Sequence, residues 1–115
     1  MNDEYLKTLL LYYEEEIMGE GYFLALSKYF DEKHEQDKMV VMAQVESYAA
    51  KAVLPLLKKY NLKSRAMIDL RLMGEQGVAK VRGLSWKEFM LQICNKYPDY
   101  LIEFTNLENM APKAD

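Results

Sequence analysis

Hydrophobic residues along this 115-residue chain recur mainly at steps of three and four, and no long stretch alternates strictly between apolar and polar positions. Such steps are typical of amphipathic α-helices, whereas strict alternation indicates half-buried strands. The pattern predicts four helices, over residues 3–30, 35–60, 65–81 and from Trp86 onward. We therefore expect one all-α domain over residues 1–115, an up-down helical bundle in which a long antiparallel hairpin of the first two helices precedes two shorter helices.

Local signals indicate where these helices begin and bend. Ser64 is the expected N-cap of the third helix, and the sequence SWKE is a capping box with Ser85 as cap and Glu88 reaching back. Pro55 is expected to kink the second helix or to be tolerated by local adjustment. Pro98 is expected to break or bend the fourth, with DYLIEFTNLENM continuing as a further helical piece.

The first predicted helix contains the stretch YYEEEIMGEGYF, residues 12–23, in which one glutamate interrupts an apolar stripe. The stripe consists of Leu6, Leu10, Tyr13, Ile17 and Leu24, and the missing step is position 20. Glu20 is therefore expected to face the core. On the same helical phase Glu14 and Glu15 face water, and Glu16 lies at the boundary.

The second predicted helix places a glutamate in the same way, because Glu46 lies in the middle of an apolar stripe that runs from Met39 to Tyr60. Consecutive helices joined by a short turn pack antiparallel, so residues equally far from the turn lie at the same height. The predicted turn, residues 31–36, lies midway between Glu20 and Glu46. We therefore expect the two carboxylates to face each other, roughly 20 Å from the turn.

Two buried carboxylates that face each other cannot both stay charged without compensation. Three interpretations remain open. A metal ion lies between Glu20 and Glu46; or the pair is protonated or bound to a cation, with a hydroxyl of Tyr13 or Tyr48 nearby; or the helical phase is off by one residue and both glutamates are on the surface.

The segments GEGYF and QVESYAAKAVLPLL resemble the first helical pair of the ferritin-like superfamily, which includes rubrerythrins and diiron-carboxylate oxygenases. Glu20 matches that family's first-helix glutamate, and Glu46 matches the glutamate of its second-helix Glu-x-x-His motif. Ala49 stands at the histidine position, and the second half of the chain contains no Glu-x-x-His. The resemblance implies either iron or manganese bound by Glu20 and Glu46, or a scaffold that has lost a complete diiron site.

Few other residues offer further ligands. Glu16 and Glu108 are candidates to join the site, whereas Glu75 faces inward on one possible stripe and outward on another. The only histidine, His34, lies in the predicted turn and is expected to be solvated. The only cysteine, Cys94, excludes an internal disulfide and is expected to be a buried, inert thiol, which fits a cytoplasmic protein.

The composition limits the classes of partner that we expect this chain to bind. A net charge of −3 offers no basic face, so nucleic-acid binding is not expected. No apolar run approaches the ~20 residues that a membrane helix needs, so no membrane partner is expected. The chain also lacks a phosphate-binding loop and a nucleophile elbow.

Two functions follow from these patterns. One is a non-catalytic scaffold or a module that binds partners, and the missing histidine favours it. The alternative is an iron or manganese protein, an oxidoreductase or a metal store, that uses Glu20 and Glu46. Ferritin-like diiron domains are usually longer than this chain, so we expect either a shortened member or a homodimer in which each copy contributes both glutamates near a shared interface.

Overall fold

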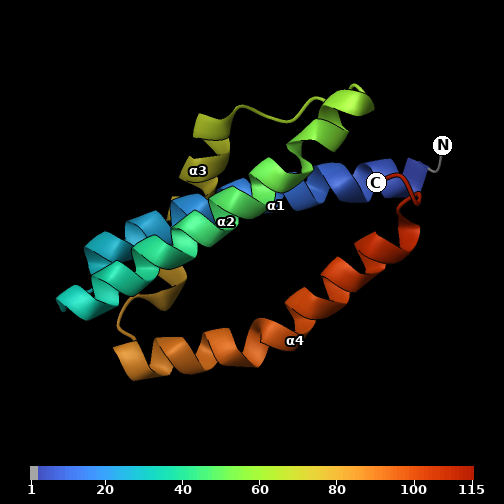
Figure 1. The fold of residues 1–115 in the computed structure, drawn as a ribbon. Coiled ribbons are helices and arrows are strands. Elements are labelled where there is room, and N and C mark those ends of the chain that lie inside the picture. The colour runs from blue at the N-terminus through green and yellow to red at the C-terminus, as the bar shows by residue number, and fades with distance from the viewer. Residues whose placement is uncertain (1–2) are drawn as a thin grey trace.

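The computed structural model describes residues 3–115, except for the side chains of Cys94 and residues 97–101. Within that range the elements are α1 (Asp3–Tyr29), α2 (Lys33–Lys59), α3 (Met67–Gln76), the 3-10 helix η1 (Gly77–Val81) and α4 (Trp86–Met110) (Figure 1). No strand occurs among the described residues. The all-α prediction is confirmed, and the predicted third helix corresponds to α3 together with η1.

The hairpin of α1 and α2 is the longest unit of the fold, and its two helices lie antiparallel and side by side (Figure 1). Each spans 27 residues, and α2 continues through Pro55 to its end at Lys59. The buried side chains of α2 are Met39, Ala43, Ala50 and Leu57. The predicted stripe on this helix is therefore one residue out of phase beyond Met39.

The third helix crosses α1 at two glycines. A Cβ atom on Gly74 would collide with the backbone carbonyl oxygen of Met18 and lie 2.9 Å from the backbone nitrogen of Tyr22. A Cβ atom on Gly21 would lie 2.7 Å from the Cα atom of Arg71. Because these neighbours are backbone atoms, no side chain can turn aside to make room. The close approach of α3 to α1 therefore requires glycine at both positions.

The start of α3 differs from the prediction. The helix begins at Met67 with Ala66 as N-cap, and no side chain caps it. The hydroxyl of Ser64 donates instead to the carbonyl oxygen of Arg65 at 3.0 Å. The backbone N–H of Arg65 donates to the carboxylate of Glu14 on α1, at 2.9 Å. The predicted Ser64 cap is wrong because this tertiary contact holds the segment before α3 against α1.

The start of α4 follows the prediction. The side chain of Ser85 accepts from the backbone N–H of Glu88, and Glu88 accepts in return from the N–H of Ser85, both at 3.2 Å. The helix then runs to Met110 without interruption. Of the two predicted alternatives, a break at Pro98 is therefore wrong, and the segment after Pro98 is helical as expected. Figure 1 shows that α4 changes direction along its length.

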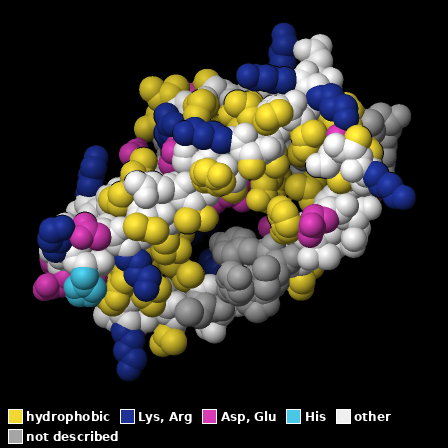
Figure 2. Space-filling view, in the orientation of Figure 1, with side chains coloured by type: hydrophobic (Ala, Val, Ile, Leu, Met, Phe, Trp, Pro, Cys, Tyr) yellow, Lys and Arg dark blue, Asp and Glu magenta, His cyan; other side chains and the backbone are white. Residues whose placement is uncertain are grey.

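The last helix is attached to the hairpin near both of its ends. Trp86 packs edge-on against Phe30, with ring centroids 5.0 Å apart, and Phe89 is fully buried beside them. Near the other end, Leu107 belongs to the core cluster that contains Tyr5 of α1. Figure 2 shows the surface hollowed between α2 and α4. The fourth helix thus runs along the length of the hairpin and contacts it near both ends (Figure 1).

Asp115 joins the start of α1 to the end of α2. Its carboxylate accepts from the hydroxyls of Tyr5 and Tyr60, at 2.7 and 2.6 Å, and pairs with the Lys59 ammonium at 2.7 Å. The hydrogen bonds from Lys59 and Tyr60 hold the pKa of Asp115 at about 2. Asp115 therefore connects two helices of the hairpin.

Candidate functional site

The acidic residues of α1 form the candidate site. Glu14 and Glu20 are buried, with exposed fractions of 8% and 9%. Glu16 is half-buried, as is Glu46 opposite it on α2. Because burial disfavours a bare carboxylate, each of these groups needs a cation, a proton or several hydrogen bonds.

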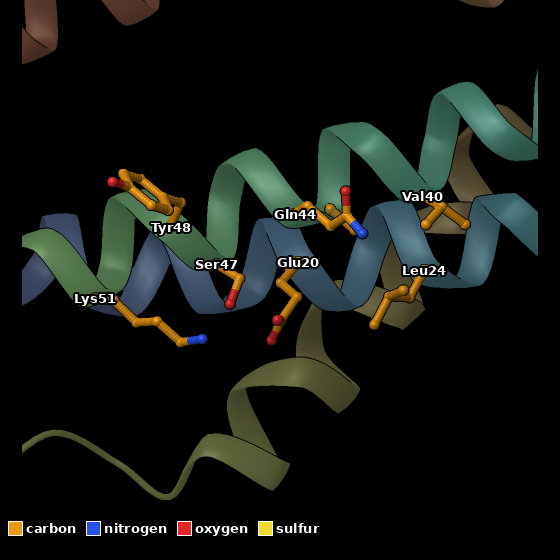
Figure 3. Close-up of a pocket in the computed structure, with 8 residues that line it drawn as sticks. Glu20, Leu24, Val40, Gln44, Ser47, Tyr48 and Lys51 are labelled. Atoms are coloured by element: carbon orange, nitrogen blue, oxygen red, sulfur yellow. The ribbon is translucent and has the colours of Figure 1, made fainter.

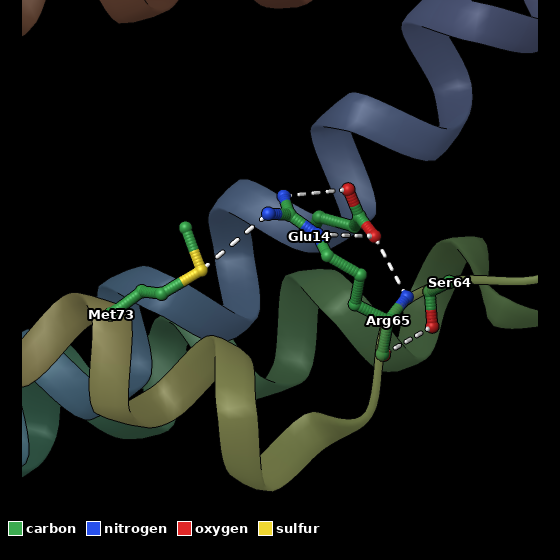
Figure 4. A network of polar contacts seen from close by, with 4 residues as sticks. All are labelled: Glu14, Ser64, Arg65 and Met73. Carbon is green, nitrogen blue, oxygen red and sulfur yellow. Dashed lines mark hydrogen bonds and ion pairs between the residues drawn. The ribbon is translucent and has the colours of Figure 1, made fainter.

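Glu14 is neutralised by Arg65, which lies in the segment before α3 (Figure 4). The guanidinium of Arg65 donates from Nη2 to Oε1 at 3.1 Å and from Nε to Oε2 at 3.3 Å. These hydrogen bonds lower the pKa of Glu14, against the opposing effect of burial. The prediction that Glu14 faces water is wrong, because the segment leading into α3 covers that side of α1.

Glu20 is neutralised by Arg71 of α3. The Nε atom of Arg71 donates to Oε1 of Glu20 at 2.6 Å. The prediction that Glu20 faces the core is confirmed, and the interpretation that places both glutamates on the surface is wrong. Neither arginine was among the residues predicted for the site. A signal was present, since Arg65 and Arg71 have the same separation along the chain as Glu14 and Glu20.

Glu46 lies against α1 where a glycine leaves space for it. Its carboxyl carbon is 3.0 Å from the position that a Cβ atom on Gly19 would take. Its carboxyl group hydrogen-bonds to that of Glu16. The partner of Glu46 is thus Glu16, whereas Glu20 binds Arg71.

The length of the turn explains this pairing. The first helix ends at Tyr29 and the second begins at Lys33, so the midpoint of the hairpin is residue 31. Position 46 then lies opposite position 16. The longer predicted turn placed the midpoint two residues further along the chain and moved the expected partner by about one helical turn, to Glu20.

Burial and the contact with Glu46 favour the protonated form of Glu16. Burial raises the pKa of Glu16 to about 9, and the hydrogen bond and negative charge of Glu46 add to the effect. Burial also raises the pKa of Tyr12 to about 12, with contributions from the charges of Glu16 and Glu46. Glu16, Glu46 and Tyr12 therefore form a polar cluster in which burial favours the protonated forms of Glu16 and Tyr12.

An open groove between α1 and α2 lies beside Glu20 (Figure 3). Its volume is about 370 Å³, and its wall combines the polar groups of Glu20, Ser47 and Lys51 with the apolar side chains of Leu24 and Val40. In Figure 3, the side chains of Glu20 and Lys51 extend to the same side of the hairpin. The groove is shallow, and the ion pair with Arg71 already engages its acidic group.

The remaining candidate ligands lie outside this cluster. Glu75 and Glu108 are exposed. His34 is exposed in the first turn of α2, with its ring centroid 6.2 Å from that of Trp86. Across the described side chains, no group of three or more His, Cys, Asp and Glu residues could hold a metal ion. Cys94 is outside the described side chains. The metal site at Glu20 and Glu46 stays a prediction.

Among the residues that the structure describes, one helix is long and apolar enough to cross a membrane, by length and composition only. Within α2, an 18-residue window has a mean hydropathy of 1.3, and 17% of that window is buried inside the protein. The core helix of a soluble protein can pass the same test. The prediction of no membrane partner stays a prediction, and the exposed apolar character of α2 is a property that the sequence analysis did not identify.

Together these elements define an all-helical protein built on an antiparallel hairpin, in which two arginines near and within α3 neutralise buried glutamates of α1. Comparison with family models, with curated proteins and with solved structures finds no match for this chain. The ferritin-like resemblance therefore stays a hypothesis based on the residues around Glu20 and Glu46.

Proposed function

We propose that this protein is a non-catalytic helical module, a ferritin-like scaffold without a complete diiron site, that assembles or binds a partner. The observation that carries the proposal is the 2.6 Å ion pair between Glu20 and Arg71. A carboxylate that a guanidinium already neutralises does not need a metal ion for its charge, and the same guanidinium repels a divalent cation.

The donor set supports the same conclusion. Diiron sites in helical bundles combine carboxylates with histidine nitrogens from Glu-x-x-His motifs. Here Ala49 stands where the histidine would lie, and Glu46 bonds to Glu16. The acidic residues of α1 therefore stabilise its contacts with α2, with α3 and with the segment before α3.

A metal titration tests the proposal. Ferrous or manganous ion, added anaerobically to the purified chain, is expected to leave the melting temperature unchanged and to remain unbound after desalting. A real site would stabilise the fold by about 2.7 kcal/mol at 100 times its Kd. Stoichiometric metal that is lost in both Glu20→Gln and Glu46→Gln would overturn the proposal.

The second candidate is a carboxylate-bound iron or manganese protein, and the contact between Glu16 and Glu46 favours it. A cation at that pair would compete with the proton that burial favours on Glu16, so its affinity would rise with pH. In this case metal binding is expected to be lost in Glu46→Gln and kept in Glu20→Gln. The same titration therefore distinguishes this site from one that uses Glu20.

A further inference from the structure

The outward face of α2 carries a continuous apolar seam. Val41, Val45, Tyr48, Ala52 and Pro55 are all exposed and follow one another at steps of four, three, four and three. The exposed fractions of the three largest, Val41, Val45 and Tyr48, are 55%, 62% and 78%. Figure 2 shows hydrophobic side chains gathered over this part of the hairpin. The buried residues of α2 lie on the opposite face.

This spacing is the one that pairs helices. Apolar residues at alternating steps of three and four form the seam of a coiled coil, in which each side chain packs between residues of a facing helix. The core of this chain is already filled from the other side of α2, through Ala43, Ala50 and Leu57. The side chains of the seam are therefore available to pack against another molecule.

We infer that the seam binds a second copy of the chain, with the two α2 helices antiparallel and the two Tyr48 side chains near the twofold axis. This inference rests on the proposed function, because it identifies the partner of the module. A twofold interface uses the same patch on both copies, so the patch must match itself when reversed. About Tyr48 the seam does so: Val41 meets Pro55 of the partner subunit, and Val45 meets Ala52 of the partner subunit.

Charges beside the seam select the antiparallel direction. Asp37, Gln44, Lys51 and Lys58 are exposed and lie seven residues apart along one flank. Reversal about Tyr48 brings Asp37 near Lys58 of the partner subunit and Gln44 near Lys51 of the partner subunit. A parallel pair would instead place this flank against the opposite flank of the partner helix, which carries the uncharged Met42, Ala49 and Leu56, and would lose the ion pair.

One contact at the end of the seam needs compensation. Antiparallel pairing brings Lys38 near Lys59 of the partner subunit. Lys59 is already paired with Asp115 at 2.7 Å, so the positive charge at this position is largely neutralised. The Asp115 contact thus removes the one like-charge approach that the antiparallel arrangement would otherwise create.

Sedimentation velocity of the full chain tests the pairing. The wild type is expected to form dimers at high micromolar concentration, whereas Val45→Asp and Tyr48→Glu weaken dimerisation by about 100-fold, since each places a charge in an apolar contact. Because both side chains are exposed, circular dichroism should show an unchanged fold. The matched control is Ile68→Asp on α3, which is 67% exposed but off the seam and should leave the dimer intact.

Charge reversal and cross-linking test the direction. Asp37→Lys or Lys58→Asp alone should weaken the dimer, and the double variant should restore it. In a Cys94→Ser background, oxidation of a mixture of Val45→Cys and Ala52→Cys chains should give the mixed disulfide dimer. Cross-links that form only between identical variants would indicate parallel helices and would overturn the arrangement.

Two results would show that the seam does not bind a second copy of the chain. A wild-type chain that stays monomeric at high micromolar concentration overturns the inference, and so does a monomer that floats with phosphatidylcholine vesicles and loses this behaviour in Tyr48→Glu. Neither result affects the proposed absence of a metal centre, which the ferrous and manganous titration decides. Conversely, a bound metal overturns the proposed function whether or not the chain dimerises.

Discussion

The carboxylates on the two sides of α1 have opposite kinds of partner. On the side of α3, Glu14 and Glu20 each bind an arginine, and the backbones approach closely at Gly21 and Gly74. On the side where Glu46 packs, Glu16 has a carboxyl partner and a tyrosine but no cation. The charge state of a glutamate in this helix is therefore determined by the element that packs on it, not by its place in the sequence.

The difference also gives the two sides opposite responses to pH. Glu14, whose pKa is lowered by Arg65, stabilises the fold while it is ionised, so acid weakens that side. A carboxyl group that holds a proton in the folded state is favoured at low pH, so alkali weakens the other side. Substitutions that affect one side at a time can therefore be told apart by their pH dependence.

The largest effect is expected at the glycine crossing. Gly74→Ala forces α3 away from the backbone of α1 and should cost about 3 kcal/mol in the free energy of unfolding. The matched control is Gly19→Ala, because its added methyl group meets the movable side chain of Glu46 rather than backbone. Urea denaturation should show a far smaller loss for Gly19→Ala, and equal losses would contradict the close crossing.

The next largest effect is expected when the buried carboxylate loses its arginine. Arg71→Met keeps most of the side-chain stem but leaves Glu20 without a cation, and should cost about 2 kcal/mol at pH 7. The double variant Arg71→Met with Glu20→Gln should regain part of that loss in the same denaturation experiment. Arg82→Met, on an exposed residue, is the control and should have little effect.

A smaller effect, of a different kind, is expected at Glu16. Because its folded-state pKa is about 9 against an ordinary value of 4.5, the folded protein keeps a proton that the unfolded chain releases. Stability should thus be highest below about pH 4.5 and fall as the pH rises to about 9. Glu16→Gln should remove this decline, a change on the order of 1 kcal/mol between pH 5 and pH 9. Parallel pH profiles for both chains would argue against a protonated Glu16 in the folded state.

The smallest effect is expected at Glu14, with the opposite sign. Its pKa is lowered by Arg65, so its contribution is present above the ordinary glutamate pKa and is lost as the pH falls through the lowered value. Glu14→Gln should cost about 0.5 kcal/mol at neutral pH, since solvent screens this partly exposed ion pair, and almost nothing in strong acid. Thermal unfolding from neutral pH to strong acid measures the cost at each pH. A cost that persists in acid would indicate that the substitution disrupts packing instead of the ion pair.

The helices could be predicted because their signals are local. Steps of three and four, together with the capping box of Ser85 and Glu88, were sufficient to place α1, α2 and the start of α4. Glu20 was likewise found from its position within an apolar stripe. These features depend on residues within one or two helical turns of each other.

The partners in the site could not be predicted in the same way. An error of two residues in the midpoint of the turn displaced the partner of Glu46 by a full turn, from Glu16 to Glu20. The arginines were missed because the crossing of α3 over α1 depends on backbone contacts between segments far apart in the chain. Only the matched separations of the glutamates and the arginines indicated this arrangement in advance.

The glycine crossing also has a consequence for how sequences related to this one can vary. With glycine required on both helices, a larger residue at position 21 or at position 74 separates the same pair of backbones. The two positions are therefore not free to change one at a time, and a sequence that lacks either glycine has lost the contact as a whole. In a survey of single substitutions, Gly21 and Gly74 should reject every other residue type, whereas the outward positions of α2 should tolerate most replacements for folding and be selective only for assembly.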